Sequence, residues 1–219
     1  TIRRDIIALD KEGRLTKVFG GAIALHQAQI VNKELSMVQK QELQTVEKQA
    51  IARFAASLIE PDDCVYLDAG TTTGWMIEYI REEKATYVTN ALSHAKRLAD
   101  KGFSVILIGG EPKSSTDAIV GAEAVLNLQK YHFSKGFFGV NGVDRMSGFT
   151  TPDAREAMVK QVAVKNTQPA HRYFLTTASK FGEVYAVTFA GFESGVILTE
   201  DNVSETLPKS IEIVKVGKN

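Results

Sequence analysis

Residues 64–74 read CVYLDAGTTTG, an apolar run that ends in an aspartate, a glycine and three threonines. CVYLD (64–68) predicts a buried strand, and TTGWMIEYIREE (72–83) predicts a helix directly after it. Gly70 permits a tight turn, after which the first backbone N–H groups of the helix and the threonine hydroxyls are available as donors. Such a helix start is suited to holding a phosphate group. A purely structural alternative, with Thr71 or Thr72 as the helix N-cap, fits this loop equally well.

Strands and helices alternate on both sides of this stretch. Further strands are predicted at 86–89, 104–110, 134–140, 171–177, 185–189 and 195–199, and further helices at 45–59, 91–102, 122–131 and from 151 onward. Thr45 and Thr151 are the expected N-caps of the first and last of these helices. Strands separated by helices of ten to fifteen residues indicate βαβ units, so the sequence predicts an α/β fold with a mainly parallel sheet.

In an open α/β sheet, ligands bind beyond the carboxyl ends of the strands. Three further strand ends carry small or amide-bearing residues, which are Thr89-Asn90, Gly109-Gly110 and Asn141-Gly142. Each alone is explained by a helix cap or a turn, but together they suit a ligand rich in hydroxyl groups. Lys180 follows another strand end and either neutralises a phosphate or is an exposed lysine in a turn.

Composition excludes several classes of protein. The 219 residues include 26 Lys plus Arg and 26 Asp plus Glu, so bulk charge does not hold this chain on nucleic acid or membrane. The single cysteine, Cys64, excludes an internal disulfide and favours a reducing cytoplasm. The four histidines lie far apart, and neither a metal site nor a cofactor is expected. No apolar run approaches the roughly twenty residues that span a bilayer.

The N-terminal region has a different pattern from the rest. TIRRDIIAL (1–9) predicts a helix, and KEGRLTKVFGGA (11–22) predicts a hairpin with its turn at Gly13 and a stop at Gly20-Gly21. Residues 26–44 are polar and rich in glutamine, without a strong strand signal, and are interpreted as a partly helical linker. Because Thr1 already lies within the predicted helix, we expect further residues to precede it.

These motifs together resemble the DeoR family of bacterial transcription regulators. TIRRD (1–5), GRL (13–15) and FGGA (19–22) resemble the end of that family's winged helix-turn-helix domain. The remainder matches the effector domain in order, through Glu47-Lys48, Ile51-Ala52, 68–73, 89–90, 109–110, Gly121, 138–142, Gly148, Thr150, 156–157 and 179–182. No single motif is decisive, but the ordered set covers essentially the whole chain. One departure is Thr177, where many relatives have an aspartate.

The resemblance implies three regions and a ligand site. Residues 1–25 would be the remaining part of the DNA-binding domain, 26–44 a linker and 45–219 the effector domain. That domain would be a Rossmann-like sheet with helices on both faces, similar to sugar-phosphate isomerases and glucosamine-phosphate deaminases. The residues expected at the effector site are Asp68, Gly70, Thr71, Thr72, Thr73, Thr89, Asn90, Gly109, Gly110, Asn141, Gly142, Glu156 and Lys180, and those expected to contact DNA are Thr1, Arg3, Arg4 and Lys17.

The function implied is that of a cytoplasmic repressor of a sugar-utilisation operon. A phosphorylated sugar would relieve its DNA binding, with fructose 1-phosphate and tagatose 6-phosphate as the first candidates. Paired half-sites in an operator imply a homodimer or homotetramer. The alternative is an enzyme similar to sugar-phosphate isomerases, which needs a general base. The amide of Asn141 cannot abstract a proton, which leaves Glu156 and Asp144 as possible bases.

Overall fold

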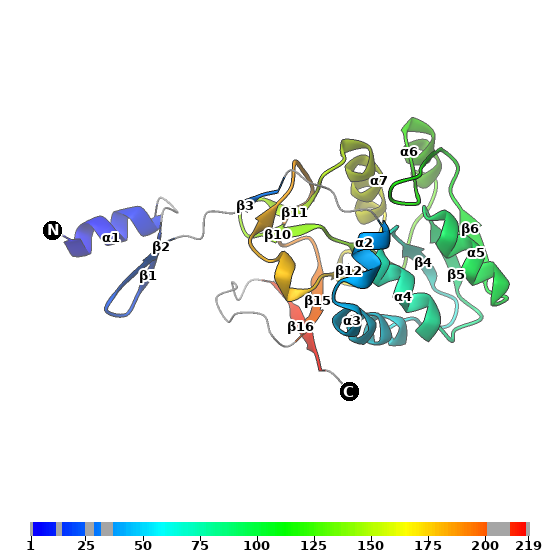
Figure 1. Cartoon of the computed structure of the whole chain (residues 1–219), viewed down its shortest axis with the longest axis horizontal. Coiled ribbons are helices and arrows are strands. Elements are labelled where there is room, and N and C mark those ends of the chain that lie inside the picture. The colour runs from blue at the N-terminus through cyan, green and yellow to red at the C-terminus, as the bar shows by residue number, and fades with distance from the viewer. Residues whose placement is uncertain (1, 12–14, 25–28, 32–36, 201–210, 218–219) are drawn as a thin grey trace.

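The computed structural model describes residues 2–11, 15–24, 29–31, 37–200 and 211–217. Its N-terminal unit consists of α1 (Ile2–Lys11) and the antiparallel hairpin of β1 (Leu15–Val18) and β2 (Gly21–Ala24). Figure 1 shows this unit at one end of the molecule, apart from the α/β body. Within the unit, the Lys17 backbone N–H donates to the Asp10 carboxylate at 2.8 Å and ties β1 to α1.

A seven-stranded sheet forms the centre of the body, and all of its strands run parallel. The predicted α/β fold with a mainly parallel sheet is therefore confirmed. Chain order runs outward in both directions from the β4–β9 pair, which makes this pair the topological switch point. The strands in spatial order are β16 (Ile213–Val216), β15 (Val196–Glu200), β12 (Arg172–Leu175), β9 (Lys135–Gly139), β4 (Cys64–Leu67), β5 (Thr86–Thr89) and β6 (Ser104–Leu107).

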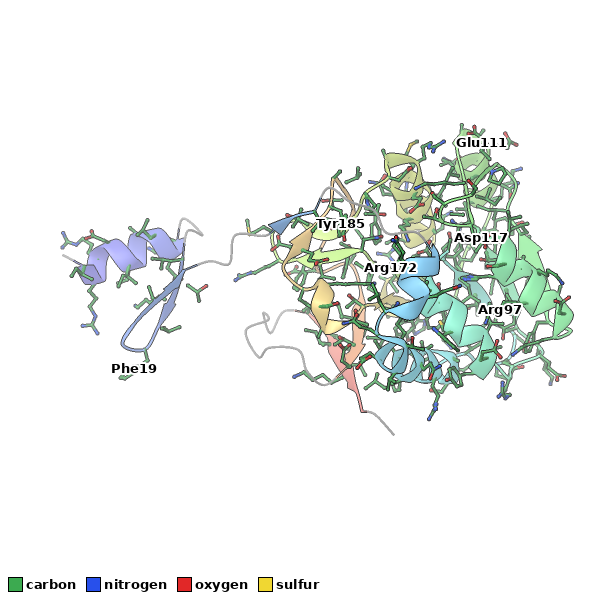
Figure 2. The ribbon with its side chains drawn as sticks, viewed as in Figure 1. Phe19, Arg97, Glu111, Asp117, Arg172 and Tyr185 are labelled. Carbon is green, nitrogen blue, oxygen red and sulfur yellow. The ribbon has the colours of Figure 1, made fainter. Side chains whose placement is uncertain are left out.

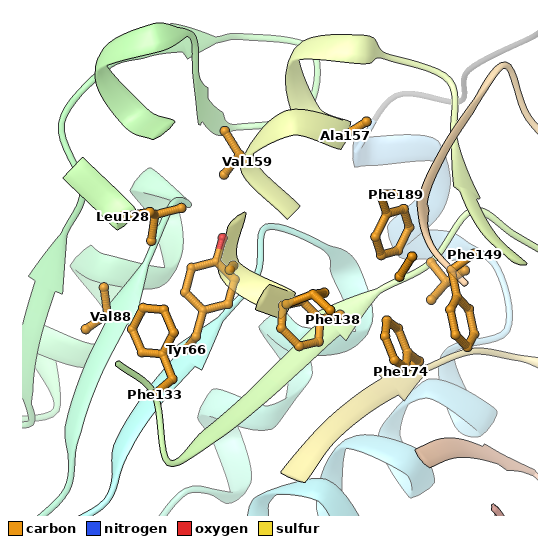
Figure 3. Packing of buried hydrophobic residues seen from close by; sticks show 14 of the residues in the cluster. Tyr66, Val88, Leu128, Phe133, Phe138, Phe149, Ala157, Val159, Phe174 and Phe189 are labelled. Atoms are coloured by element: carbon orange, nitrogen blue, oxygen red, sulfur yellow. The ribbon is translucent and has the colours of Figure 1, made fainter. Parts of the chain in front are cut away.

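Helices cover both faces of this sheet. Successive side chains of each strand point to opposite faces, so each strand contributes to a core on either side. Val65 and Leu67 of β4 pack in a core with α3 (Thr45–Ser57), α4 (Thr71–Tyr79) and α5 (Leu92–Asp100). Tyr66, between them, packs in a second core with α6 (Ala122–Leu128) and α7 (Ala154–Lys165). Figure 3 shows the second core, in which the rings of Phe149 and Phe174 stack at 3.8 Å between centroids.

Short antiparallel and irregular elements complete the body, and of these only the strand at 185–189 and helix within 26–44 were predicted, as β14 (Val187–Ala190) and α2 (Met37–Glu42). β10 (Gly142–Asp144), β11 (Gly148–Thr151) and β14 form a three-stranded sheet, and β7 (Glu111–Lys113) pairs with β8 (Ala118–Val120). β3 (Gln29–Ile30) pairs in parallel with β13 (Glu183–Val184). The one-turn helices are η1 (Pro169–His171) and η2 (Ala178–Lys180), and α2 precedes α3.

Three local predictions were wrong. The hairpin turns at Phe19-Gly20, where Gly20 has a φ of 88°, and Gly21 opens β2 instead of stopping it; Gly13 lies outside the described residues. Thr45 is not an N-cap, because Gln44 occupies that position. Thr151 ends β11, and the Asp153 carboxylate caps α7 by accepting the N–H groups of residues 155 and 156 at 2.8 and 3.2 Å.

Candidate functional site

A cavity of about 240 Å³ lies at the carboxyl ends of β4 and β9, where a doubly wound sheet is expected to bind its ligand. The loops after these strands supply Ala69 to Thr72 and Gly139 to Asn141. Three other parts of the chain close it: residues 40–48, the β7–β8 hairpin with α7, and residues 179–185. Figure 2 shows Tyr185, one of the residues of this last group.

The loop after β4 presents an uncapped helix start to the cavity. Gly70 is the N-cap residue of α4, no side chain of the described part of the chain caps this helix, and the first helical bond runs from Gly74 N–H to Gly70 O. Thr71 and Thr72 are therefore first-turn residues, and the N-cap alternative for them is wrong. Thr73 turns its hydroxyl inward and donates to Asp68 O at 2.7 Å and Gly70 O at 3.0 Å, which fixes the turn. The partial positive charge of this helix start favours an anion in the cavity.

Two lysines add positive charge to the same cavity. Lys180 is partly buried and its Nζ donates to Val140 O at 2.5 Å. Burial and the neighbouring ammonium groups of Lys48, Lys40 and Lys160 lower the pKa of Lys180 to about 7. Lys48 is buried, and burial with Lys40 nearby lowers its pKa to about 8. Both shifts reflect cations held close together away from water, an arrangement that a bound anion stabilises.

Asp68 lies directly behind the cavity and is fully buried. Its Oδ2 accepts hydrogen bonds from the Lys160 ammonium and from Gly139 N–H, the latter at 3.0 Å. Lys160 itself lines the cavity and also donates to Gly139 O at 3.0 Å. Burial raises the pKa of Asp68, and the Lys160 ammonium opposes this effect. The pair thus joins the loop after β4 to the loop after β9 and holds a cation at the cavity wall.

Glu156, on the first turn of α7, supplies negative charge to the cavity lining. Its carboxylate accepts from Thr116 Oγ1 at 2.5 Å and from Lys113 Nζ at 3.0 Å. Lys113 also pairs with Asp153 at 3.0 Å. Because residues 113 and 116 belong to the β7–β8 hairpin, these bonds attach the hairpin to the N-terminal end of α7. The cavity lining therefore combines cationic groups with hydrogen-bonding carboxylate and amide groups.

The structure brings together six of the thirteen residues predicted for the effector site. Gly70, Thr71, Thr72, Asn141, Glu156 and Lys180 line the cavity, and the other seven do not. Asp68 and Thr73 lie in the loop after β4 and at the start of α4, next to residues that line the cavity, without lining it themselves. Asn90 is buried, and its Oδ1 accepts from Ala69 N–H at 2.9 Å and from Tyr66 OH at 3.1 Å. Thr89 is buried and accepts from Ala91 N–H at 3.1 Å, so it belongs to the end of β5.

Three predicted glycines do not line the cavity. Gly109 and Gly110 follow β6 at the edge of the sheet, where a Cβ on Gly110 would lie 2.7 Å from Val120 O. A Cβ on Gly142 would lie 2.3 Å from Glu183 O. Backbone therefore passes close to Gly110 and Gly142, whereas a Cβ on Gly109 would meet only Asn127 Nδ2, at 4.0 Å. Asp144, considered as a base, accepts from two N–H groups of the β10–β11 turn and does not line the cavity.

Sequence reasoning missed Lys48 and Lys160, which lie within helices rather than at strand ends. Each occupies the buried face of its helix, Lys48 beside Ala52 and Ala55, and Lys160 beside Ala163. A lysine at an apolar position of a helical repeat was the available signal, because an unpaired lysine is rarely buried. Lys40, Gln44, Thr116, Ser179, Glu183 and Tyr185 also line the cavity and were missed.

Thr177, the departure from the family pattern, does not line the cavity. Its hydroxyl donates to Gln44 Oε1 at 2.7 Å, and Ser179 Oγ donates to the same oxygen at 3.0 Å. The threonine therefore joins the loop after β12 to the residue that precedes α3.

The residues expected to contact DNA lie in the N-terminal unit. Arg3, Arg4 and Lys17 are exposed, whereas Thr1 lies outside the described residues. α1 buries none of its residues. Figure 2 shows Phe19 at the tip of the hairpin, fully exposed to solvent.

The described residues contain neither a candidate metal site nor a helix able to span a membrane. Across residues 2–11, 15–24, 29–31, 37–200 and 211–217, no group of three or more His, Cys, Asp or Glu side chains is arranged to hold a metal ion. Within the same ranges, every helix is too short or too polar to cross a bilayer.

Comparison with known proteins places the chain in a family. Residues 43–202 match the DeoR C terminal sensor domain, and residues 1–28 match the DeoR-like helix-turn-helix domain. The uncharacterized HTH-type transcriptional regulator FruR of Bacillus subtilis (strain 168) is 42% identical over 221 residues, covering 100% of this chain and 86% of the relative. The lactose phosphotransferase system repressor of Staphylococcus aureus (strain N315) is 36% identical, covering 98% and 86%.

Among solved structures, ribose 5-phosphate isomerase A from Neisseria gonorrhoeae has a TM-score of 0.45 at 13% identity, covering 66% of this chain and 55% of that one. The family rests on the sensor-domain match, which spans most of the chain, and on relatives similar over nearly all of it. The chain therefore belongs to the DeoR family of transcription regulators.

Proposed function

We propose that the chain is a repressor of a sugar-utilisation operon and that its cavity binds a phosphorylated monosaccharide which relieves DNA binding. One observation carries this proposal: the uncapped start of α4 and the ammonium groups of Lys48 and Lys180 line one cavity of about 240 Å³. Helix N–H groups and lysines together are suited to a phosphate. Family membership makes the chain a transcription regulator, so the isomerase alternative has no support.

Other polar groups of the cavity lining suit the hydroxyl groups of a sugar. Asn141 offers an amide, Glu156 a carboxylate and Tyr185 a phenol. An amide both donates and accepts, a carboxylate accepts from hydroxyls, and neither requires the ligand to be charged at that end. Fructose 1-phosphate and tagatose 6-phosphate are the first compounds to test.

The DNA-binding side of the proposal concerns the N-terminal unit. Arg3 and Arg4 on α1 and Lys17 on β1 are exposed and would contact DNA phosphates or base edges beside Thr1. Two such units are needed to read paired half-sites, so a homodimer or homotetramer is proposed, acting in the cytoplasm. Ligand and operator would then weaken each other's binding by the same factor.

A thermal-shift screen of the chain with sugars and sugar phosphates tests the ligand class. A compound that binds only the folded state raises the melting temperature. We expect a phosphorylated monosaccharide to raise it and the matching free sugar to leave it unchanged. A response to free fructose equal to that of fructose 1-phosphate would argue against a phosphate site. Sustained chemical conversion of a bound sugar phosphate would contradict the sensor assignment.

A further inference from the structure

Residues 37–44, which connect the N-terminal region to α3, form one wall of the cavity. Lys40 lies on α2, and Leu43 and Gln44 join α2 to α3; all three line the cavity. The polar composition of residues 26–44 was interpreted as a partly helical linker, and the part of it from Lys40 to Gln44 lies against the loops that line the cavity.

Gln44 attaches this segment to the loop after β12. It has a φ of 51° and a ψ of 44°, in the left-handed region that residues other than glycine seldom adopt. Its side-chain oxygen accepts the hydroxyl hydrogen bonds of Thr177 and Ser179 described above. Thr177 directly precedes η2 and Ser179 lies within it, and η2 presents Lys180 to the cavity. The docking of residues 37–44 thus depends on the same loop that supplies the lysine.

Lys48 connects the segment to the cavity a second time. Its side chain is only 3% exposed and lines the cavity, yet its Nζ donates to the backbone carbonyl of Lys40 on α2. An ammonium group bonds more strongly to an ionised oxygen than to a neutral carbonyl. A phosphate in the cavity would therefore compete with the Lys40 carbonyl for this ammonium group.

A third attachment lies earlier in the same region. β3 pairs with β13, and Val31 N–H donates to Val184 O at 2.9 Å. Glu183 and Tyr185, on either side of Val184, line the cavity. The region between the hairpin and α3 is thus attached at both of its described parts to chain that forms the cavity wall.

We infer that residues 37–44 are part of the ligand site and that an anionic ligand draws the Lys48 ammonium group from the Lys40 carbonyl, which changes the docking of α2. This inference rests on the proposed function, since it requires a phosphorylated ligand in the cavity. It gives the ligand a direct path to the DNA-binding region, because the segment that changes is the one leading to it.

Hydrogen exchange of the whole chain, read by mass spectrometry, tests the inference with fructose 1-phosphate, inorganic phosphate and fructose as probes. With a probe that raises the melting temperature, the amides of α2 should exchange about tenfold faster, the effect of losing roughly one hydrogen bond. Exchange in β9, at the centre of the sheet, should stay unchanged. Fructose should alter neither region.

Two variants separate coupling from binding. Thr177→Val removes one bond to Gln44 by a change at a residue that does not itself line the cavity, so α2 should exchange faster before any ligand is added. Thr167→Val is the matched control, because the Thr167 hydroxyl donates within α7 to Ala163 O, and it should leave α2 unchanged. Lys48→Met, at saturating ligand, should abolish the response of α2 to the ligand.

The outcomes are distinguishable. If fructose 1-phosphate or inorganic phosphate raises the melting temperature while exchange in α2 stays the same, the inference is wrong and the proposed function stands. If no phosphorylated sugar shifts the melting temperature, the proposed function and the inference fail together. A response of α2 that persists in Lys48→Met would also overturn the role given to this lysine.

Discussion

The strand ends at β4 and β9 and those at β5 and β6 carry similar residues, yet only the first pair opens onto the cavity. Gly70 and Asn141 follow β4 and β9, whereas Asn90 and Gly109 follow β5 and β6. The β7–β8 hairpin fills the space beyond β5, where Ile119 N–H donates to Asn90 O at 2.6 Å. Beyond β4 and β9 the chain departs in opposite directions, which leaves a crevice.

Position in the sheet, and not residue type at a strand end, thus decides where the cavity lies. Small and amide-bearing residues permit close approach of any group. At the switch point they face the cavity, and one strand away Asn90 meets the backbone of the β7–β8 hairpin. The following predictions test this distinction, from the largest expected effect on ligand affinity to the smallest.

Gly70→Val should abolish ligand binding. A Cβ at this position lies 3.2 Å from Thr73 Oγ1, so the side chain displaces the hydroxyl that fixes the start of α4. We expect affinity for a sugar phosphate to fall on the order of 100-fold or more, or about 2.8 kcal/mol, measured by calorimetric titration. Gly109→Val is the matched control, because a Cβ there meets only Asn127 Nδ2 at 4.0 Å. Equal losses in both variants would remove the distinction between the two pairs of strand ends.

Lys180→Met should weaken binding by about 10- to 100-fold, the range expected when a hydrogen bond to a charged group is lost. Methionine keeps most of the side-chain volume and removes the charge. Lys96→Met is the control, because Lys96 is exposed on α5 and pairs with Asp100 at 2.8 Å. Unchanged affinity in Lys180→Met would exclude this lysine from the phosphate site.

Ligand affinity should rise as the pH falls from 8.5 to 7. The Lys180 ammonium group has a pKa lowered to about 7 in the empty cavity, so it is largely neutral at pH 8.5 and binding must supply a proton. A bound dianion raises this pKa again, and affinity gains up to about tenfold per pH unit above 7. Lys48, with a pKa of about 8, adds to the same trend.

Proton uptake on binding is measured by titration calorimetry in buffers of different ionisation enthalpy. Above pH 7 a sugar phosphate remains mostly dianionic, because its second pKa is about 6. The trend therefore reports on the protein. Lys180→Met should reduce the uptake, and an uptake of zero in the unaltered chain would show that Lys180 is charged in the empty cavity.

Asn90→Ala should affect stability more than affinity. The amide oxygen accepts from the half-buried Ala69 N–H and from the buried Tyr66 hydroxyl, and its loss leaves them without that acceptor. We expect a loss of about 1–3 kcal/mol in the free energy of unfolding by urea titration, with only a few-fold weaker ligand binding. A larger loss of affinity than for Lys180→Met would mean that β5 contributes directly to the site.

The sequence predicted the framework because its signals are local. The apolar runs at 64–68 and 86–89 coincide with β4 and β5, since a buried parallel strand needs a continuous apolar stretch. Three-residue strands such as β7 and β10 were missed because so short a run has no periodicity. The caps at Thr45 and Thr151 were wrong because Gln44 and Asp153 have tertiary or capping partners that a residue preference does not report.

The cavity lining was predicted where its residues follow strand ends, as Gly70, Asn141 and Lys180 do, or belong to the family pattern, as Glu156 does. Gly70 to Thr72 were found because strand, turn and helix are contiguous. Lys48 and Lys160 were missed because they reach the cavity from helix interiors, and Gln44 because its partner is 133 residues away. Long-range contacts depend on the spatial order of the strands in the sheet, which their order along the chain does not specify.

The hydrogen bonds of Gln44 to Thr177 and Ser179 join uncharged groups, while the cavity holds several lysines. Dissolved salt screens attraction between separated charges and leaves a contact between neutral groups nearly unaffected. Rising ionic strength should therefore weaken binding of an anionic ligand, while the hydrogen bonds of Gln44 to Thr177 and Ser179 keep their strength. Raising the salt concentration should thus release the ligand without breaking the contacts that attach residues 37–44 to the loop after β12.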